Sequence, residues 1–138
     1  MRFYWRPLIP GEHDPELLWG STLGAAALIA AAWLRSGFPT PLCPLHTLTR
    51  IPCPTCGMTR ATTAILHGDI AASLAWNPLM TLVLSGAALY ILYAAVVVIG
   101  KLPRLRWTPA SGLESLLIRI WLILLIAANW AYLIWRGV

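Results

Sequence analysis

Three long apolar runs constrain this chain more than any other feature of its sequence. Residues 17–34 and 79–100 carry no charged side chain, and residues 113–135 carry only Glu114 and Arg119. A helix of about 20 apolar residues is long enough to cross the roughly 30 Å hydrocarbon core of a bilayer. Only 11% of the 138 residues are charged, whereas soluble domains use about a quarter. The sequence therefore predicts an integral membrane protein with three spanning helices, and it argues against a water-soluble monomer.

The basic residues bear on the orientation of the chain in the membrane. The net charge is +5, but the basic side chains are spread over loops and segment ends, without a patch interleaved with aromatic residues, so no nucleic acid partner is expected. With the N-terminus inside, the inner side carries five basic residues, namely Arg2, Arg6, Lys101, Arg104 and Arg106. The outer side then carries four, namely Arg35, Arg50, Arg60 and Arg136. Because positive loops favour the cytoplasm, the balance slightly favours an N-terminus inside.

The segment between the first two runs, residues 35–57, differs in kind from its neighbours. It contains five prolines, all three cysteines of the chain and His46. This density of proline predicts an extended, turning loop without a helix. Beyond it, residues 57–76 are expected to form short interfacial helices, the first of them amphipathic, and Asn77-Pro78 is a typical helix start. We therefore predict an all-α membrane protein in which residues 1–138 form a single domain.

Small residues on the first span predict a helix-packing surface. Gly20 and Gly24 lie four residues apart, in the small-xxx-small pattern that lets two helices approach closely. The pattern is common by chance in alanine-rich spans, and the partner helix could belong to this chain or to another protein.

The cysteines of the connector occur in a spacing that suits a metal ion. Cys43 and His46 are separated by two residues, as are Cys53 and Cys56. Pairs of this spacing let both side chains reach one ion, and a Cys3His set suits tetrahedral zinc. The string Cys-Pro-x-Cys-Gly at residues 53–57 resembles the knuckles of zinc ribbons and rubredoxins over these five residues. A metal would also fix an otherwise long, unstructured connector.

Three other interpretations of the cysteines remain open. Cys53 and Cys56 could form a redox-active pair, because a following helix N-terminus lowers the pKa of a thiol. They could equally form a structural disulfide if the loop faces an oxidising compartment. Finally, all three cysteines could be small apolar residues at a lipid interface. Arg60, one turn after Cys56, could pair with a lipid phosphate, offset thiolate charge, contact a partner or extend to the interface.

The middle of the chain resembles a widespread bacterial family of small integral membrane proteins of unknown function. The resemblance rests on Cys43-Pro-x-His46, on Cys53-Pro-x-Cys56-Gly-x-Thr-Arg60, and on the His-Gly-Asp and Asn-Pro-Leu strings that follow, up to residue 79. It implies an integral protein of the bacterial cytoplasmic membrane and no established reaction.

Taken together, the sequence favours an auxiliary, assembly or interaction protein over an enzyme. A complete metal-ligand set occurs without a nucleotide loop or a serine or carboxylate catalytic set. We expect a structural zinc ion in the loop, the lipid bilayer as surroundings, and a membrane protein or a second copy of the chain as partner. The alternative is a membrane thiol–disulfide protein that uses Cys53 and Cys56.

Overall fold

The three apolar runs form the three longest helices of the computed structural model, which describes residues 2–7, 13–39, 43–108 and 111–137. These helices are α1 (Pro15–Arg35), α5 (Pro78–Ile99) and α6 (Gly112–Arg136). Averaged over its most apolar 18 residues, each helix has a mean hydropathy of 1.7, 2.5 or 2.0, in chain order. Each helix is long and apolar enough to cross a membrane. The predictions of a helical fold and of three candidate spans are confirmed.

Each long helix begins at a side chain that caps its first turn. Asp14 accepts a hydrogen bond from the backbone N–H of Leu17, and Asn77 accepts one from Met80 in the same way. A proline follows each of these two caps, at a position where a helix needs no N–H donor. Ser111 caps α6 through the N–H of Glu114. The predicted helix starts therefore coincide with the observed ones to within two residues.

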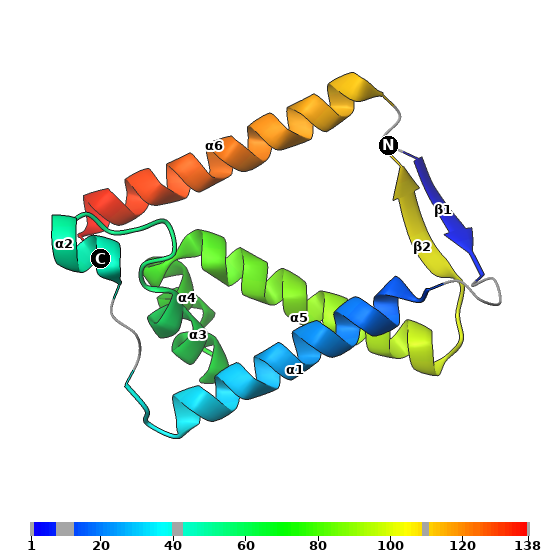
Figure 1. Cartoon of the computed structure of the whole chain (residues 1–138), viewed down its shortest axis with the longest axis horizontal. Coiled ribbons are helices and arrows are strands. Elements are labelled where there is room, and N and C mark those ends of the chain that lie inside the picture. Colours follow the sequence, from blue (N-terminus) through cyan, green and yellow to red (C-terminus); the bar gives the residue numbers. More distant parts are fainter. Residues whose placement is uncertain (1, 8–12, 40–42, 109–110, 138) are drawn as a thin grey trace.

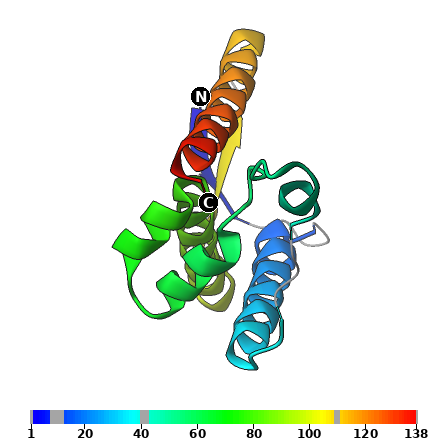
Figure 2. The ribbon, with the colours of Figure 1, turned by 90° about the vertical axis from the view of Figure 1, so that its left-hand side faces the viewer.

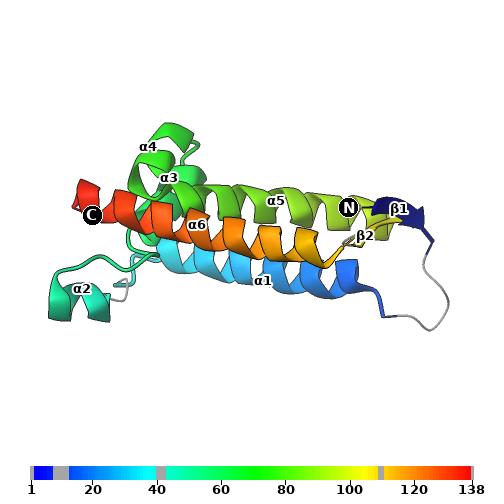
Figure 3. The ribbon, with the colours of Figure 1, turned by 90° about the horizontal axis from the view of Figure 1, so that it is seen from above.

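The three long helices span the length of the molecule, with α1 and α5 crossing each other in Figure 1, and the other elements gather at its two ends (Figures 1 and 3). One end carries strands β1 (Arg2–Arg6) and β2 (Arg104–Thr108). The opposite end carries α2 (Pro44–Thr49), α3 (Met58–Leu66) and α4 (Ile70–Trp76). The N-terminal strand and the cysteine-containing connector thus lie at opposite ends of the helices. That the N-terminal end faces the cytoplasm stays a prediction.

Two features of the short elements were not expected from the sequence. Strands β1 and β2 pair antiparallel, with Arg2 opposite Thr108 and Arg6 opposite Arg104, and nothing in either five-residue segment indicates its distant partner. The connector also contains α2, so the prediction that residues 35–57 lack a helix is wrong. Pro44 occupies the first helical position, where the missing N–H costs nothing, so this proline starts a helix instead of preventing one. Residues 40–42 of the connector lie outside the described residues.

Helices α1 and α5 lie side by side, as two views from different directions show (Figures 1 and 2). A Cβ atom added to Gly20 would lie 2.7 Å from the Cβ atom of Ala94. A contact this short cannot be accommodated without a shift of one helix, so the glycine is required for the observed separation. At Gly24 an added Cβ atom would meet nothing within 4 Å among the described residues. Of the two predicted packing glycines, Gly20 is therefore the one in contact with α5.

Buried ion pairs connect the start of α1 to β2. Arg106 Nη1 lies 2.7 Å from Glu16 Oε1, and Arg104 pairs with Asp14. The side chains of Glu16 and Arg104 are only 5% and 8% exposed, so their charges are largely removed from water. Each charge is therefore stabilised by the oppositely charged side chains beside it. The Arg104 guanidinium holds the pKa of the Asp14 carboxyl below its usual range. This cluster fixes the strands to the end of the helices that lies away from the cysteines (Figure 1).

The two glycines of α1 provide a matched test of this packing. We expect Gly20→Ala to lower the free energy of unfolding by about 1–3 kcal/mol, because the new methyl group overpacks the contact with Ala94. Gly24→Ala should leave stability unchanged or raise it by about 0.5–1 kcal/mol, since alanine is the better helix former. Thermal or denaturant unfolding of both variants in one detergent measures the difference. Equal losses in the two variants would contradict the observed helix contact.

Candidate metal centre

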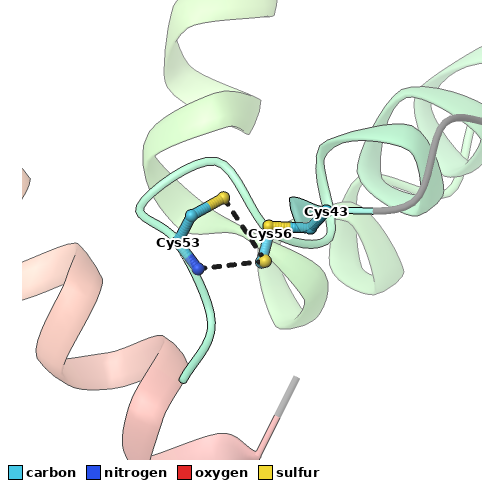
Figure 4. A group of neighbouring side chains, drawn as sticks. All are labelled: Cys43, Cys53 and Cys56. Atoms are coloured by element: carbon cyan, nitrogen blue, oxygen red, sulfur yellow. Dashed lines mark hydrogen bonds between the residues drawn. The ribbon is translucent and has the colours of Figure 1, made fainter. Parts of the chain in front are cut away.

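Three thiol side chains from two separate segments meet at the end of the molecule that carries α2, α3 and α4 (Figure 4). Cys43 directly precedes α2, whereas Cys53 and Cys56 lie in the turn before α3. The three Sγ atoms all lie within 4.8 Å of one another, and the three side chains are half-buried and free of disulfides. The structure therefore brings together all three cysteines of the predicted ligand set.

A tight turn places the second pair of thiols. The N–H of Cys56 donates to the carbonyl oxygen of Cys53 over 2.9 Å, and Gly57 has a φ of 79°, a conformation that favours glycine. The backbone N–H of Cys53 in turn donates to Cys56 Sγ over 3.1 Å. Backbone donors aimed at sulfur stabilise thiolates, which are the form that binds metal. We refer to residues 52–57 as the knuckle.

The spacing of the sulfurs fits one cation. Sulfurs bound to one zinc ion at about 2.3 Å in tetrahedral geometry lie about 3.8 Å apart. Cys53 Sγ and Cys56 Sγ are 3.4 Å apart, and Cys43 Sγ lies within 4.8 Å of both. Small side-chain movements would bring all three to bonding distance from a common centre. The donor set, three sulfurs, suits a soft or borderline cation such as zinc.

His46, the fourth predicted ligand, lies outside this group. Its side chain is exposed on the first turn of α2, three residues after Cys43. Among the possible metal-ligand atoms of the described His, Cys, Asp and Glu side chains, the group of three or more that all lie within 4.8 Å of one another consists of the three cysteine sulfurs. Ligation by His46 thus stays a prediction.

The two thiols of the knuckle differ in acidity. Burial alone would raise the pKa of Cys53, but hydrogen bonds with Thr55, Cys43 and Cys56 outweigh it and lower the pKa to about 7. Burial and the neighbouring Cys53 sulfur raise the pKa of Cys56 to about 12. The first proton of the pair is therefore lost from Cys53. A second thiolate beside the first needs a nearby positive charge, which a divalent cation would supply.

Side chains of α5 and α6 hold the backbone of the knuckle. The Asn77 side-chain amide donates to the carbonyl oxygen of Cys56 over 2.9 Å and to that of Pro54 over 3.3 Å. The Asn129 amide donates to the same Pro54 oxygen over 3.1 Å. Trp130 Nε1 donates to the carbonyl oxygen of Pro52 over 2.7 Å. Three carbonyl groups of the knuckle are thereby bound to two of the long helices.

The same two asparagines also stabilise the helix start next to the knuckle. Asn129 Oδ1 accepts from the N–H of Leu79, and Asn77 Oδ1 accepts from that of Met80, so each amide bridges the knuckle and the first turn of α5. Asn77 is fully buried and Asn129 is 6% exposed. Asn129, a lone amide within an apolar span, thus bonds to the start of another helix. A polar amide in an apolar environment requires such partners.

Sequence reasoning missed part of this network. Aromatic residues in an apolar run, such as Trp130 and Tyr132, are typical of a lipid interface. Trp130 nevertheless donates to the knuckle, and the Tyr132 hydroxyl donates to the carbonyl oxygen of Ala75 over 3.0 Å. Asn77 was expected only to cap α5. Nothing in the sequence around Trp130 or Tyr132 indicates a carbonyl partner some 60 to 80 residues away. Among these residues, only Asn129, a lone polar side chain in an apolar run, indicates from the sequence that it needs a hydrogen-bond partner.

The acidity of the knuckle can be tested by alkylation of the metal-free protein. We expect the rate at Cys53 to reach half its maximum near pH 7, because the thiolate is the reactive form, while Cys56 stays unmodified there. Thr55→Val removes the hydroxyl 3.2 Å from Cys53 Sγ and should shift the Cys53 profile to higher pH. Peptide mass spectrometry separates the two sites, and Thr59→Val is the control. A common profile with a midpoint near the ordinary value of about 8.5 for both cysteines would contradict the assignment.

The hydrogen bond from α6 to the knuckle can be tested with two identical substitutions. Trp130→Phe removes the donor to Pro52, and we expect it to lower the free energy of unfolding by about 0.5–1.5 kcal/mol and to speed alkylation of Cys53. Trp121→Phe, on the same helix, alters a side chain that is 64% exposed and should leave both quantities nearly unchanged. Unfolding in detergent and timed alkylation supply the measurements. If the two variants behave alike, α6 does not hold the knuckle.

Comparisons with known proteins find similarity over the segment that contains the three cysteines. A family model described as "Protein of unknown function (DUF2752)" matches residues 43–92, which begin at Cys43, include the knuckle and end within α5. No curated protein and no solved structure matches the chain. The match supports the expected similarity to an uncharacterised family.

Proposed function

We propose that this chain is a membrane auxiliary or assembly protein in which Cys43, Cys53 and Cys56 bind one zinc ion that fixes the connector as a docking surface. The observation that carries the proposal is the convergence of three free thiols from two segments within 4.8 Å. The three long apolar helices are compatible with an integral membrane protein. The expected partner is a membrane protein or a second copy of the chain.

Metal binding accounts for more of the site than a disulfide does. A disulfide would use two of the three sulfurs and leave the third beside it without a role. A cation uses all three, and it links Cys43 at the start of α2 to the knuckle before α3. It would thereby link the connector to the knuckle, which Asn77 and Asn129 bind through hydrogen bonds from the start of α5 and from α6. Zinc fits because three thiolates and a neutral ligand form one of its common structural sites.

The proposal includes His46 as the fourth ligand. A site with four protein ligands is closed and supports a structural role, whereas three protein ligands and a bound water are typical of catalytic zinc. His46 follows Cys43 by three residues, on the short helix that Cys43 precedes. Three thiolates and a neutral imidazole on a divalent cation leave a net charge near −1.

Metal analysis of protein purified without chelator tests the proposal. We expect close to one zinc per chain, and a loss of most of this metal in Cys43→Ser, Cys53→Ser and Cys56→Ser variants, since each removes a ligand. His67→Ala, which changes the other histidine of the short helices, should keep the metal, and it is the matched control for His46→Ala. Protein that holds no metal and gains none on incubation with zinc would refute the metal site.

Cobalt substitution separates the role of His46 from that of the cysteines. With His46 as a ligand, His46→Ala should weaken metal binding at least about 10-fold, because even the loss of a residue that only orients a ligand costs about 10- to 100-fold. It should also change the visible spectrum of the cobalt protein, while His67→Ala changes neither. An unchanged spectrum would exclude His46 from the ligand set, and with it the closed site, but would leave the three-sulfur site standing.

A second candidate is a membrane thiol–disulfide protein that uses Cys53 and Cys56. It is favoured by the low pKa of Cys53, about 7, and by the 3.4 Å between the two sulfurs. In this case a mild oxidant should remove two hydrogens from the dithiol, with a matching loss of mass, and a reductant should restore them. Thiols that resist both oxidant and alkylating agent until metal is chelated would exclude this function.

A further inference from the structure

Helices α3 and α4 carry a shallow cavity of about 410 Å³ that the metal site does not use. Its polar lining comes from Thr59, Arg60, Thr63, His67 and Asp69, and Trp76 supplies an aromatic wall. The two helices form a hairpin that packs on α5 next to the knuckle (Figures 1 and 2). Arg60 belongs to the Cys-Gly-x-Thr-Arg string noted in the sequence, and its role is not explained by the sulfur cluster.

The guanidinium of Arg60 is held in place without being neutralised. Its central carbon lies 4.6 Å from the centre of the Trp76 ring, in a cation–π contact. Within the part of the chain that the structure describes, Arg60 has no carboxylate partner and its side chain donates no hydrogen bond. A guanidinium stacked on a ring keeps the N–H groups at its edge available for a planar pair of acceptors. The planar guanidinium can donate two parallel hydrogen bonds to two phosphate oxygens, which a lysine ammonium cannot do.

The other polar groups limit the charge that the cavity can accept. The hydroxyl of Thr63 donates to the carbonyl oxygen of Thr59, and Asp69 caps α4 by accepting from the N–H of Ala72 over 2.8 Å. His67 is exposed beside them. The carboxylate of Asp69 disfavours a doubly charged anion nearby, so a phosphodiester with a single negative charge suits the cavity better than free phosphate.

The hairpin lies where lipid headgroups are expected. Helix α4 ends at Trp76, and Asn77 alone connects it to the apolar helix α5, which begins at Pro78. Several large apolar side chains of the hairpin are exposed, among them Leu66, Ile70 and Leu74. A short helical surface that combines exposed apolar residues with a basic residue and a tryptophan is typical of segments at the membrane interface.

We infer that this cavity binds the phosphodiester group of a phospholipid, with the Arg60 guanidinium on the phosphate oxygens and Trp76 as the support of that guanidinium. The chemistry recognised is the phosphodiester, and the acyl chains would lie along the apolar side chains of the hairpin. The inference is independent of metal binding at the cysteines.

Native mass spectrometry of the full chain in mild detergent tests the assignment, with phosphatidylglycerol as the added lipid. We expect Arg60→Gln to reduce the retained lipid about tenfold or more, because a charge-assisted contact is lost. Trp76→Leu should reduce it by about two- to fivefold, as expected for loss of a cation–π support. Arg35→Gln removes an exposed charge from the same end of the molecule and should change retention less than twofold, within about 0.4 kcal/mol. All variants alter exposed side chains, and an unchanged unfolding midpoint verifies that they fold.

Two further arms identify what is recognised. Diacylglycerol with the same acyl chains should not be retained, because it lacks the phosphate. Millimolar inorganic phosphate should not displace the bound lipid; displacement would assign the cavity to free phosphate and overturn the lipid assignment. Equal retention of diacylglycerol and phospholipid, or full retention by Arg60→Gln, would overturn the phosphate site altogether.

Discussion

The hydrogen bonds between the knuckle and the side chains of Asn77, Asn129 and Trp130 are the interaction on which the rest of the structure depends. An irregular turn that packs against apolar helices removes its carbonyl groups from water, and each buried carbonyl group left unpaired would cost free energy. Here the carbonyl oxygens of Pro52, Pro54 and Cys56 are all paired with donors from α5 and α6. The turn can therefore lie against the helices without exposing unpaired backbone.

This arrangement also explains why the sulfurs converge. The backbone of the knuckle is held by its own turn and by side chains of α6 and of the start of α5, through hydrogen bonds that involve no cation. Cys43 then has only to approach a preformed pair, which it does from the start of α2. A preformed site lowers the conformational entropy that metal binding must overcome. The contacts of Asn129 and Trp130 extend this site to α6, whose buried residues are Asn129 and Leu133. A metal bound at the sulfurs would in this way stabilise the position of the long helix α6 as well as that of the connector.

Hydropathy and capping were enough to predict most of the fold, whereas contacts distant in sequence were not. The three long helices follow from the absence of charge, and the start of α5 follows from Asn77-Pro78. The pairing of β1 with β2 links segments about 100 residues apart. Polar and apolar residues alternate over Arg104–Thr108, as in a strand, but neither segment indicates its partner. Helix α2 was missed because proline was counted as a helix breaker, although at Pro44 it occupies the one position that helices accept.

The candidate site, too, could be predicted from local sequence patterns but not in its contacts with distant segments. Local spacing predicted that Cys53 and Cys56 would face each other, and the pairing of motifs predicted the approach of Cys43. The spacing of His46 from Cys43 matches that of Cys56 from Cys53, yet His46 lies on a helical turn and its side chain is exposed. The knuckle contacts of Trp130 were invisible, since a tryptophan near the end of an apolar run is equally typical of a lipid interface.

X-ray absorption spectroscopy at the zinc edge, on the purified protein loaded with one equivalent of zinc, tests the central claim most directly. The structure predicts three sulfur neighbours at about 2.3 Å, with one nitrogen or oxygen neighbour completing the tetrahedron. A spectrum with only nitrogen and oxygen neighbours, or with fewer than three sulfurs, would contradict the convergence of Cys43, Cys53 and Cys56 on a single ion.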